Sequence, residues 1–195
     1  MPKKPLSKSE LRVHQSACGG VLRNRRSGRK KRSLSTRFTM HLVLRARWAY
    51  GAWSFTAPNI RQMINYVIAK HELRTGIQVL EVGNAGNHLH LRVKISSRVQ
   101  YNNFIRAVTG EIARKIKLSR EGFYGEKEGG FWERRPFSSI VAGARYSTVI
   151  TNYIKINQLQ GLGIRRSDAR MLIKKWSDKI RISQQSISQP YIART

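Results

Sequence analysis

The sequence predicts an α+β fold of the ferredoxin-like type, with a four-stranded antiparallel sheet, two helices on one face of it and a further helix after it. Three observations lead to this prediction. One segment, residues 87–95, alternates strictly between apolar and polar side chains, and a second, residues 40–47, follows a similar pattern. Two others carry apolar residues at helical spacing, and the order is strand, helix, strand, strand, helix, strand. With 195 residues and an apolar fraction of 40%, the chain is expected to form one domain with appended tails.

The first strand and helix are expected in residues 40–76. Residues 40–47 place Leu42 and Leu44 on one face of a strand and His41 on the other, because successive side chains of a strand point to opposite faces. Pro58 marks a helix start, since the first amides of a helix have no intrahelical partner. The apolar stripe that follows consists of Ile60, Met63, Ile64, Val67 and Ile68, and Gly76 ends the unit.

A β-hairpin is expected next, formed by residues 77–82 and 87–95. Residues 83–86, Gly-Asn-Ala-Gly, suit the turn because they accept positive φ values. In the second strand of the hairpin, apolar residues alternate with histidines and cations. One face would therefore carry His88, His90, Arg92 and Lys94, and the other Leu89, Leu91, Val93 and Ile95.

The remaining elements follow in order. Ser97 is a plausible N-cap for the second helix, and residues 131–137 are expected to form the fourth strand. Two helices beside one face would leave the other sheet face open. A third helix is expected at residues 144–160, outside this basic fold, and a short last helix beginning at Ser167.

Charge is the strongest compositional signal. The chain has 38 Lys and Arg against 10 Asp and Glu, which gives a formal net charge of +28. A surplus of this size indicates a polyanionic partner, with nucleic acid favoured over an acidic membrane surface. No apolar run of about 18 residues and no secretory signal is present, so we expect a cytoplasmic, nucleoid-associated protein without membrane contact. The single cysteine, Cys18, excludes an internal disulfide and a cysteine-based zinc cluster.

Basic residues are concentrated in the first 38 positions. This segment holds twelve Lys or Arg and one acid, Glu10, with little apolar periodicity, which is typical of an extended, flexible arm. The arm would either hold phosphates or be a solvated tail that only improves solubility. We expect three parts, which are the arm at 1–38, a domain at 39–162, and a basic C-terminal helix and tail at 163–195.

Two pairs of residues carry candidate chemistry. His88 and His90, two apart on a strand, can hold one divalent ion, although such pairs also occur by chance. Tyr153 and Asn157 are four apart on a helix and lie on the same side, where they could supply a nucleophile and a third ligand. The alternative is that Tyr153 belongs to the apolar core.

These residues resemble a known family. Asn87-His88-Leu89-His90 is similar to the HUH motif, and Asn152-Tyr153-Ile154-Lys155-Ile156-Asn157 is similar to the tyrosine helix of single-tyrosine HUH transposases, in particular the REP-associated tyrosine transposases. The resemblance covers about residues 38–162.

The resemblance implies a DNA strand transferase that acts on single-stranded or hairpin-forming repeat DNA. His88, His90 and Asn157 would bind one Mg²⁺ or Mn²⁺, and Tyr153 would form a 5′-phosphotyrosine and free a 3′-hydroxyl. Relatives act as monomers or as homodimers that exchange tyrosine helices. The sequence departs from the family where Gln158, rather than proline, follows Asn157, so Gln158 is a weaker candidate ligand.

Cations and aromatic residues are candidates for DNA contacts. Side chains expected to hold phosphates are Arg45, Arg92, Lys94, Arg134 and Arg135, together with Arg29, Lys30, Lys31 and Arg32 of the arm. Phe131, Trp132 and Trp176 are candidates for stacking on unpaired bases, although aromatic side chains are more often buried.

Two other functions compete with strand transfer. One is a non-enzymatic nucleic-acid-binding module of ferredoxin-like fold, for which an open sheet and the positive charge would suffice. The other is an inactive descendant of a transposase that only binds repeats. The first lacks the aromatic-rich strand expected for base stacking, and the complete set of two histidines, tyrosine and asparagine argues against the second.

Overall fold

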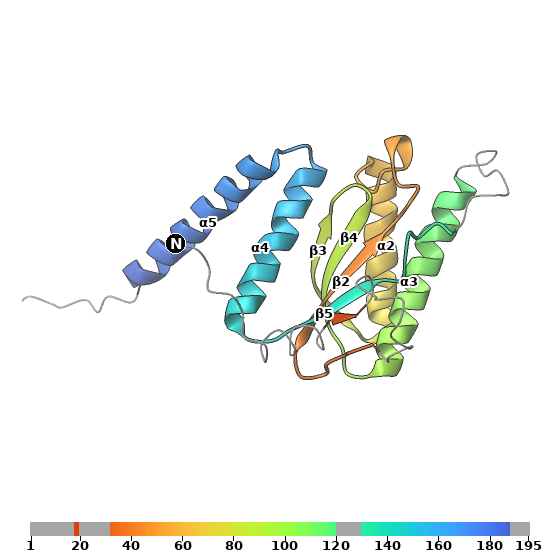
Figure 1. Cartoon of the computed structure of the whole chain (residues 1–195), viewed down its shortest axis with the longest axis horizontal. Coiled ribbons are helices and arrows are strands. Elements are labelled where there is room, and N and C mark those ends of the chain that lie inside the picture. The colour runs from red at the N-terminus through yellow and green to blue at the C-terminus, as the bar shows by residue number, and fades with distance from the viewer. Residues whose placement is uncertain (1–17, 20–31, 120–129, 188–195) are drawn as a thin grey trace, which may run out of the picture.

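The computed structural model describes residues 18–19, 32–119 and 130–187 (Figure 1). Four strands and the two-residue strand β1 form a five-stranded sheet, with α2 and α3 on one side of it and α4 and α5 on the other. The elements are β1 (Cys18–Gly19), β2 (Thr39–Arg45), the short 3₁₀ helix η1 (Gly51–Trp53), α2 (Pro58–Thr75), β3 (Gln78–Asn84), β4 (His88–Lys94), α3 (Arg98–Leu118), β5 (Phe137–Val141), α4 (Ala144–Gly161) and α5 (Arg166–Ile187).

The sheet has the strand order β1-β5-β2-β4-β3, and each neighbouring pair is antiparallel. α2 connects β2 to β3, and β4 lies between these two strands in the sheet. α3 connects β4 to β5, and β2 lies between that pair. Two interleaved split βαβ units of this kind define the ferredoxin-like plan. The predicted fold class is therefore confirmed.

The local signals that start and end the first two helices act as expected. Pro58 is the first residue of α2, and Gly76 follows its last turn with a left-handed φ of 67°. The Ser97 hydroxyl accepts a hydrogen bond from the backbone N–H of Gln100 at 3.1 Å and caps α3. The apolar faces of both helices and of the central strands form the main core, which includes Leu42, Leu44, Ile64, Val67, Leu89, Leu91, Phe104, Val108 and Ile112.

The fourth strand lies later in the chain than we expected. It spans Phe137–Val141, whereas residues 131–136 form only an isolated bridge between Trp132 and Ala46. Pro136 has no N–H to give to a strand ladder, which explains why regular pairing begins after it. The fourth strand was correctly placed in the order of elements, but its predicted bounds were wrong.

Two further differences concern the ends of the fold. The last helix, α5, is 22 residues long rather than short. Cys18 and Gly19 of the basic arm form the two-residue strand β1 against Ser138 and Ser139 of β5. None of the helices in the described ranges combines the length and apolar character needed to cross a lipid bilayer.

The sheet face opposite α2 and α3 is not open, contrary to expectation. α4 lies against it over β3, and Ile150 and Ile154 of α4 form a small second core with Val141 of β5 (Figure 1). α5 packs on the outer side of α4. The helix that carries Tyr153 and Asn157 is thus part of the domain, and it closes the polar face of the sheet.

Candidate active site

Three histidines gather on the polar face of the sheet. His41 comes from β2, and His88 and His90 come from β4, where Val43 lies opposite His90 and Arg45 opposite His88. His41 Nε2 and His90 Nδ1 are 3.1 Å apart and share a hydrogen bond. The ring centroids of His88 and His90 are 4.8 Å apart. The strand alternation read from the sequence therefore places both histidines of the pair on one face.

A glycine beside His90 lets α4 approach the sheet. Gly83 of β3 is paired with His90, and a Cβ at Gly83 would lie 2.7 Å from Cγ2 of Ile154. At the end of α4, a Cβ on Gly161 would overlap the backbone carbonyl of Asn84. Only glycine fits at either contact in this packing, so these two positions determine how closely α4 sits on β3.

Polar contacts hold the same helix at its first turns. Arg92 of β4 donates to Ser147 of α4 at 2.7 Å and to Glu81 of β3 at 2.9 Å. The same Glu81 oxygen accepts a hydrogen bond from Thr151 of α4 at 2.8 Å. Arg92 and Glu81 face each other across β3 and β4 next to a register shift in β3. The pair forms an anchor for α4, and Arg92, expected to contact phosphate, is already bonded within the domain.

Tyr153 and Asn157 are brought to the histidines by α4 of the same chain. The Tyr153 ring stands edge-on to His90, with 5.2 Å between centroids, and edge-on to His41 at 6.0 Å. Its exposed fraction is 37%, so it lies at the margin of the site and not in the core. Asn157 is buried and donates from Nδ2 to the Tyr153 carbonyl at 2.7 Å, and its side chain lies near that of His88.

Burial keeps the three imidazoles neutral. It lowers the pKa of His41 to about 4. The pKa of His90 is lowered to about 3, mainly by burial and further by the neighbouring His41, His88 and Arg45. Burial and the charge of Arg45 lower the pKa of His88, and the hydrogen bond with Asn157 acts in the opposite direction.

The site has the features of a cation site. Nε2 of His90 is buried without a hydrogen-bond partner, and neutral imidazole is the form that binds metal. His88 Nδ1 donates to the Asn87 side-chain oxygen at 2.7 Å, which leaves Nε2 of the neutral ring unprotonated. Asn157 Nδ2 donates to the Tyr153 carbonyl, and the side-chain oxygen of Asn157, which can only accept hydrogen bonds, could serve as a further ligand. No three His, Cys, Asp or Glu side chains of the described part converge to hold an ion, and the set here differs because its third member is an amide.

The other candidate DNA cations have varied surroundings. Arg45 is exposed and forms an ion pair with Glu133, with 3.8 Å between Nε and Oε2. Arg134 and Arg135, which follow Glu133 in the chain, are also exposed. Lys94 donates to the Arg37 carbonyl at 2.6 Å. Arg32 bonds Ser138 at 2.9 Å and the Pro136 carbonyl. Arg29, Lys30 and Lys31 lie outside the described residues.

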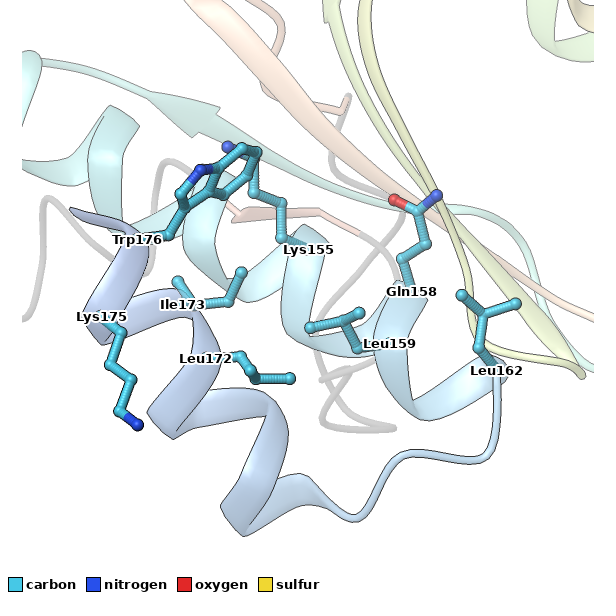
Figure 2. A pocket seen from close by; sticks show the side chains of 8 residues that line it. All are labelled: Lys155, Gln158, Leu159, Leu162, Leu172, Ile173, Lys175 and Trp176. Atoms are coloured by element: carbon cyan, nitrogen blue, oxygen red, sulfur yellow. The ribbon is translucent and has the colours of Figure 1, made fainter. Parts of the chain in front are cut away.

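The three aromatic candidates for base stacking differ in their exposure to solvent. Phe131 is buried, and Trp132 is partly buried, with its Nε1 donating to the Thr109 carbonyl at 3.0 Å. Trp176 of α5 is 56% exposed and lines a groove of about 660 Å³ between α4 and α5 (Figure 2). Lys155 Nζ lies 4.7 Å from the Trp176 ring centroid, and Leu159 and Leu172 form part of the apolar wall. Of the three aromatic candidates, Trp176 is the one that remains accessible to a base.

Sequence reasoning underestimated two residues. The sequence placed His41 on the polar face of the first strand without a role in the site, yet it bonds His90 directly. Glu81 was not singled out from the sequence, because the register shift between Val79 and Glu81 decides which residue of β3 faces Arg92. The one available signal for His41 was its place on the polar face of a strand with the same alternation as β4.

An antiparallel sheet with two histidines on an inner strand, covered by a helix bearing tyrosine and asparagine, defines a candidate nucleic-acid-processing site. A family model described as "Transposase IS200 like" matches residues 35–157, well over half of the chain. The chain belongs to this family, which gives it a transposase role and DNA as its partner.

Other comparisons add little to the family assignment. The chain has no match among curated proteins. Among solved structures, that of a candidate transposase from Deinococcus radiodurans R1, at 1.90 Å resolution, aligns with a TM-score of 0.44 and 14% identity. The alignment covers 67% of this chain and 98% of that chain.

Proposed function

We propose that the protein is a metal-dependent single-strand DNA endonuclease and strand transferase of the single-tyrosine HUH type, acting through a 5′-phosphotyrosine on Tyr153. The observation that carries the proposal is the position of Tyr153, whose ring lies 5.2 Å from that of His90 while remaining partly exposed. A tyrosine in the core could not reach a DNA backbone. This one lies where the buried histidines meet solvent.

Tyr153 performs the covalent step. Its hydroxyl loses a proton, and the oxygen attacks the phosphorus of a phosphodiester in single-stranded DNA. The bond from phosphorus to the 3′-oxygen breaks, and that oxygen leaves and takes up a proton as a 3′-hydroxyl. The DNA remains joined to Tyr153 through its 5′-phosphate, so the bond energy is kept for rejoining. Attack by a 3′-hydroxyl reverses the step and restores the tyrosine.

His88, His90 and Asn157 would hold one Mg²⁺ or Mn²⁺. The residues fit this role because burial favours neutral imidazoles, Nε2 of His90 has no partner among the described residues, and the Asn157 oxygen offers a further lone pair near His88. The bound ion would polarise a phosphoryl oxygen and orient the leaving group. Asn157 also hydrogen-bonds the Tyr153 carbonyl, which couples the nucleophile to the ligand set within one turn of helix.

The substrate we propose is a hairpin-forming repeat of the REP type. Arg45, Arg134 and Arg135 are exposed and would hold phosphates close to the strand that carries His88. The complete set of His88, His90, Tyr153 and Asn157 lies within one chain. This supports action as a monomer, without exchange of tyrosine helices between subunits.

The non-enzymatic alternative has less support. It needs an open sheet face for bases, and α4 covers that face over β3. The inactive-descendant alternative requires a missing functional group, whereas the tyrosine, both histidines and the asparagine are present together. We therefore favour the enzyme.

The test is formation of a covalent complex with labelled single-stranded hairpin DNA and Mn²⁺. We expect a denaturation-resistant adduct with the wild-type chain and with Tyr146→Phe, a control on the same helix, but none with Tyr153→Phe. Tyr153→Phe should still bind the hairpin, and a chelator should prevent the adduct. An adduct that persists in Tyr153→Phe would exclude Tyr153 as the nucleophile.

A further inference from the structure

His41 makes a direct contact with a candidate metal ligand but has no role in the function proposed above. Its Nε2 lies 3.1 Å from Nδ1 of His90, and the two ring planes differ by only 7°. Both side chains are buried, with exposed fractions of 4% and 1%. The contact is therefore closed to bulk solvent, and one of the two nitrogens supplies the hydrogen to the other.

The direction of this hydrogen bond decides what His90 can do. If His41 donates, a neutral His90 carries its hydrogen on Nε2, which is then a buried donor without an acceptor and cannot bind a metal. If His90 donates from Nδ1, its Nε2 has a free lone pair. Nε2 of His90 has no hydrogen-bond partner in the described part of the chain, which a metal ion would supply.

We propose that His41 is a positioning residue that accepts the Nδ1 hydrogen of His90 and thereby keeps Nε2 of His90 unprotonated for metal binding. The inference rests on the proposed function in so far as it takes His90 as a ligand. His41 is not itself a ligand through Nε2, because that atom is used in the bond to His90.

The surroundings of His41 hold its ring in this orientation. Its strand, β2, runs between β4 and β5, so the backbone is paired on both sides. The ring meets Phe137 edge-on, with 6.5 Å between centroids, and Tyr153 edge-on at 6.0 Å. A ring packed between two aromatic rings in a sheet interior has little freedom to turn Nε2 away from His90.

A hydrogen bond of this kind has a known physical effect. It fixes the tautomer and orientation of the imidazole and raises the basicity of the nitrogen that binds the metal. Loss of such a partner typically lowers metal affinity about 10- to 100-fold. In this site the partner is a second histidine, whose neutral form can accept one hydrogen bond and donate another.

The decisive measurement uses the metal-free wild-type chain labelled with ¹⁵N. Long-range ¹H–¹⁵N spectra distinguish the two tautomers of His90 without metal, DNA or turnover. We expect Nδ1 protonated and Nε2 unprotonated. A spectrum with the hydrogen on Nε2 would overturn the proposal, because His41 would then be the donor.

Two variants extend the test to Mn²⁺ binding, measured by titration calorimetry. His41→Gln keeps an oxygen that can accept from His90 and should retain the Nδ1-protonated tautomer and most of the affinity. His41→Leu offers no acceptor and should lose about 10- to 100-fold. Equal affinities for the two variants would contradict the role of His41.

These results are independent of DNA cleavage. If the tautomer and the Mn²⁺ affinities follow expectation but no adduct forms on Tyr153, the strand-transfer proposal fails and the role of His41 stands. If the adduct forms but His90 is protonated on Nε2, the strand-transfer proposal stands and the role proposed for His41 fails. Thermal unfolding of both variants identifies any loss that arises from misfolding.

Discussion

Gly83 of β3 lies directly beneath Ile154 of α4, and a Cβ at Gly83 would come within 2.7 Å of Ile154 Cγ2 and 2.8 Å of its carbonyl oxygen. Gly83 is also the residue paired with His90 across the sheet. One glycine therefore sets the separation between the strand that carries the histidines and the helix that carries Tyr153. The contact links backbone packing to the geometry of the candidate site.

We expect Gly83→Ala to displace α4 and to separate Tyr153 from His90. Overpacking against a backbone carbonyl costs about 1–3 kcal/mol in stability. Because catalysis depends on alignment, a shift of about 1 Å can lower the rate of a reaction about 100-fold. The rate of adduct formation on single-stranded DNA measures this effect.

Gly110→Ala is a matched control for this substitution. Gly110 lies inside α3, and a Cβ there would meet nothing within 4 Å. Alanine in a helix interior should stabilise the fold by about 0.5–1 kcal/mol and leave adduct formation unchanged. If Gly83→Ala forms the adduct as fast as Gly110→Ala, the close contact with α4 does not set the geometry.

The periodic parts of the fold and site follow from sequence, whereas the contacts between elements do not. Alternation placed His88 and His90 on one face, and helical spacing placed Tyr153 and Asn157 on one side of α4. The close packing of α4 on β3 depends on the absence of a side chain at Gly83, a position that the sequence analysis assigned to a turn. The Arg92–Glu81 pair that anchors α4 depends on the register shift before Glu81 in β3, and the periodicity of the sequence does not reveal this shift.

Arg134 and Arg135 should contribute to DNA binding, whereas Arg92 should position α4. The first two are exposed, whereas Arg92 is bonded to Glu81 and Ser147. Replacing both Arg134 and Arg135 by Gln should reduce the slope of log affinity against log salt by about 1.4, because each phosphate of a single strand that a cation neutralises contributes about 0.7 to that slope. Fluorescence anisotropy of a labelled oligonucleotide measures this slope.

Arg92→Gln serves as the contrast in that experiment. It should leave the salt slope close to that of the wild type but slow adduct formation, because α4 loses its anchor. A large change of slope in Arg92→Gln would show that Arg92 neutralises a phosphate, as the strand pattern alone suggested.

Trp176 should contribute to binding of single-stranded DNA. Its ring is exposed in the groove between α4 and α5, with Lys155 beside it to attract phosphate. A base stacked on an aromatic ring contributes about 1–3 kcal/mol, so Trp176→Ala should weaken binding of an unpaired oligonucleotide about 5- to 150-fold. Tyr66→Ala is the control, because Tyr66 is 60% exposed but lies on α2, beyond the sheet. Equal affinities of the two variants would remove the groove from the DNA path.

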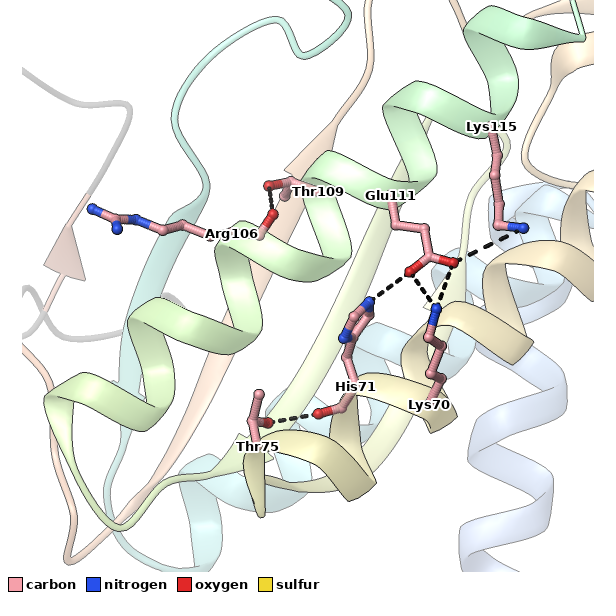
Figure 3. A network of polar contacts seen from close by, with 7 residues as sticks. All are labelled: Lys70, His71, Thr75, Arg106, Thr109, Glu111 and Lys115. Carbon is pink, nitrogen blue, oxygen red and sulfur yellow. Dashed lines mark hydrogen bonds and ion pairs between the residues drawn. The ribbon is translucent and has the colours of Figure 1, made fainter.

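Glu111 should make the fold sensitive to acid. Its carboxylate joins α3 to α2 through Lys70 at 2.9 Å and His71 at 2.8 Å (Figure 3). The hydrogen bond from Lys70 is the main cause that lowers the pKa of Glu111, the bond with His71 lowers it further, and burial opposes both. A carboxyl whose pKa is lower in the folded state stabilises the fold above its unfolded pKa, and this contribution is lost as the pH falls through the folded pKa.

We therefore expect Glu111→Gln to lower the free energy of unfolding by about 1–3 kcal/mol at neutral pH, where the ionised carboxylate is lost from a site that is 13% exposed. As the pH falls below the folded pKa of Glu111, the wild type should lose this advantage and the two stabilities should converge. Urea unfolding at a series of pH values measures the difference. A difference that stays constant into acid would mean that the charge of Glu111 does not stabilise the contact between α2 and α3.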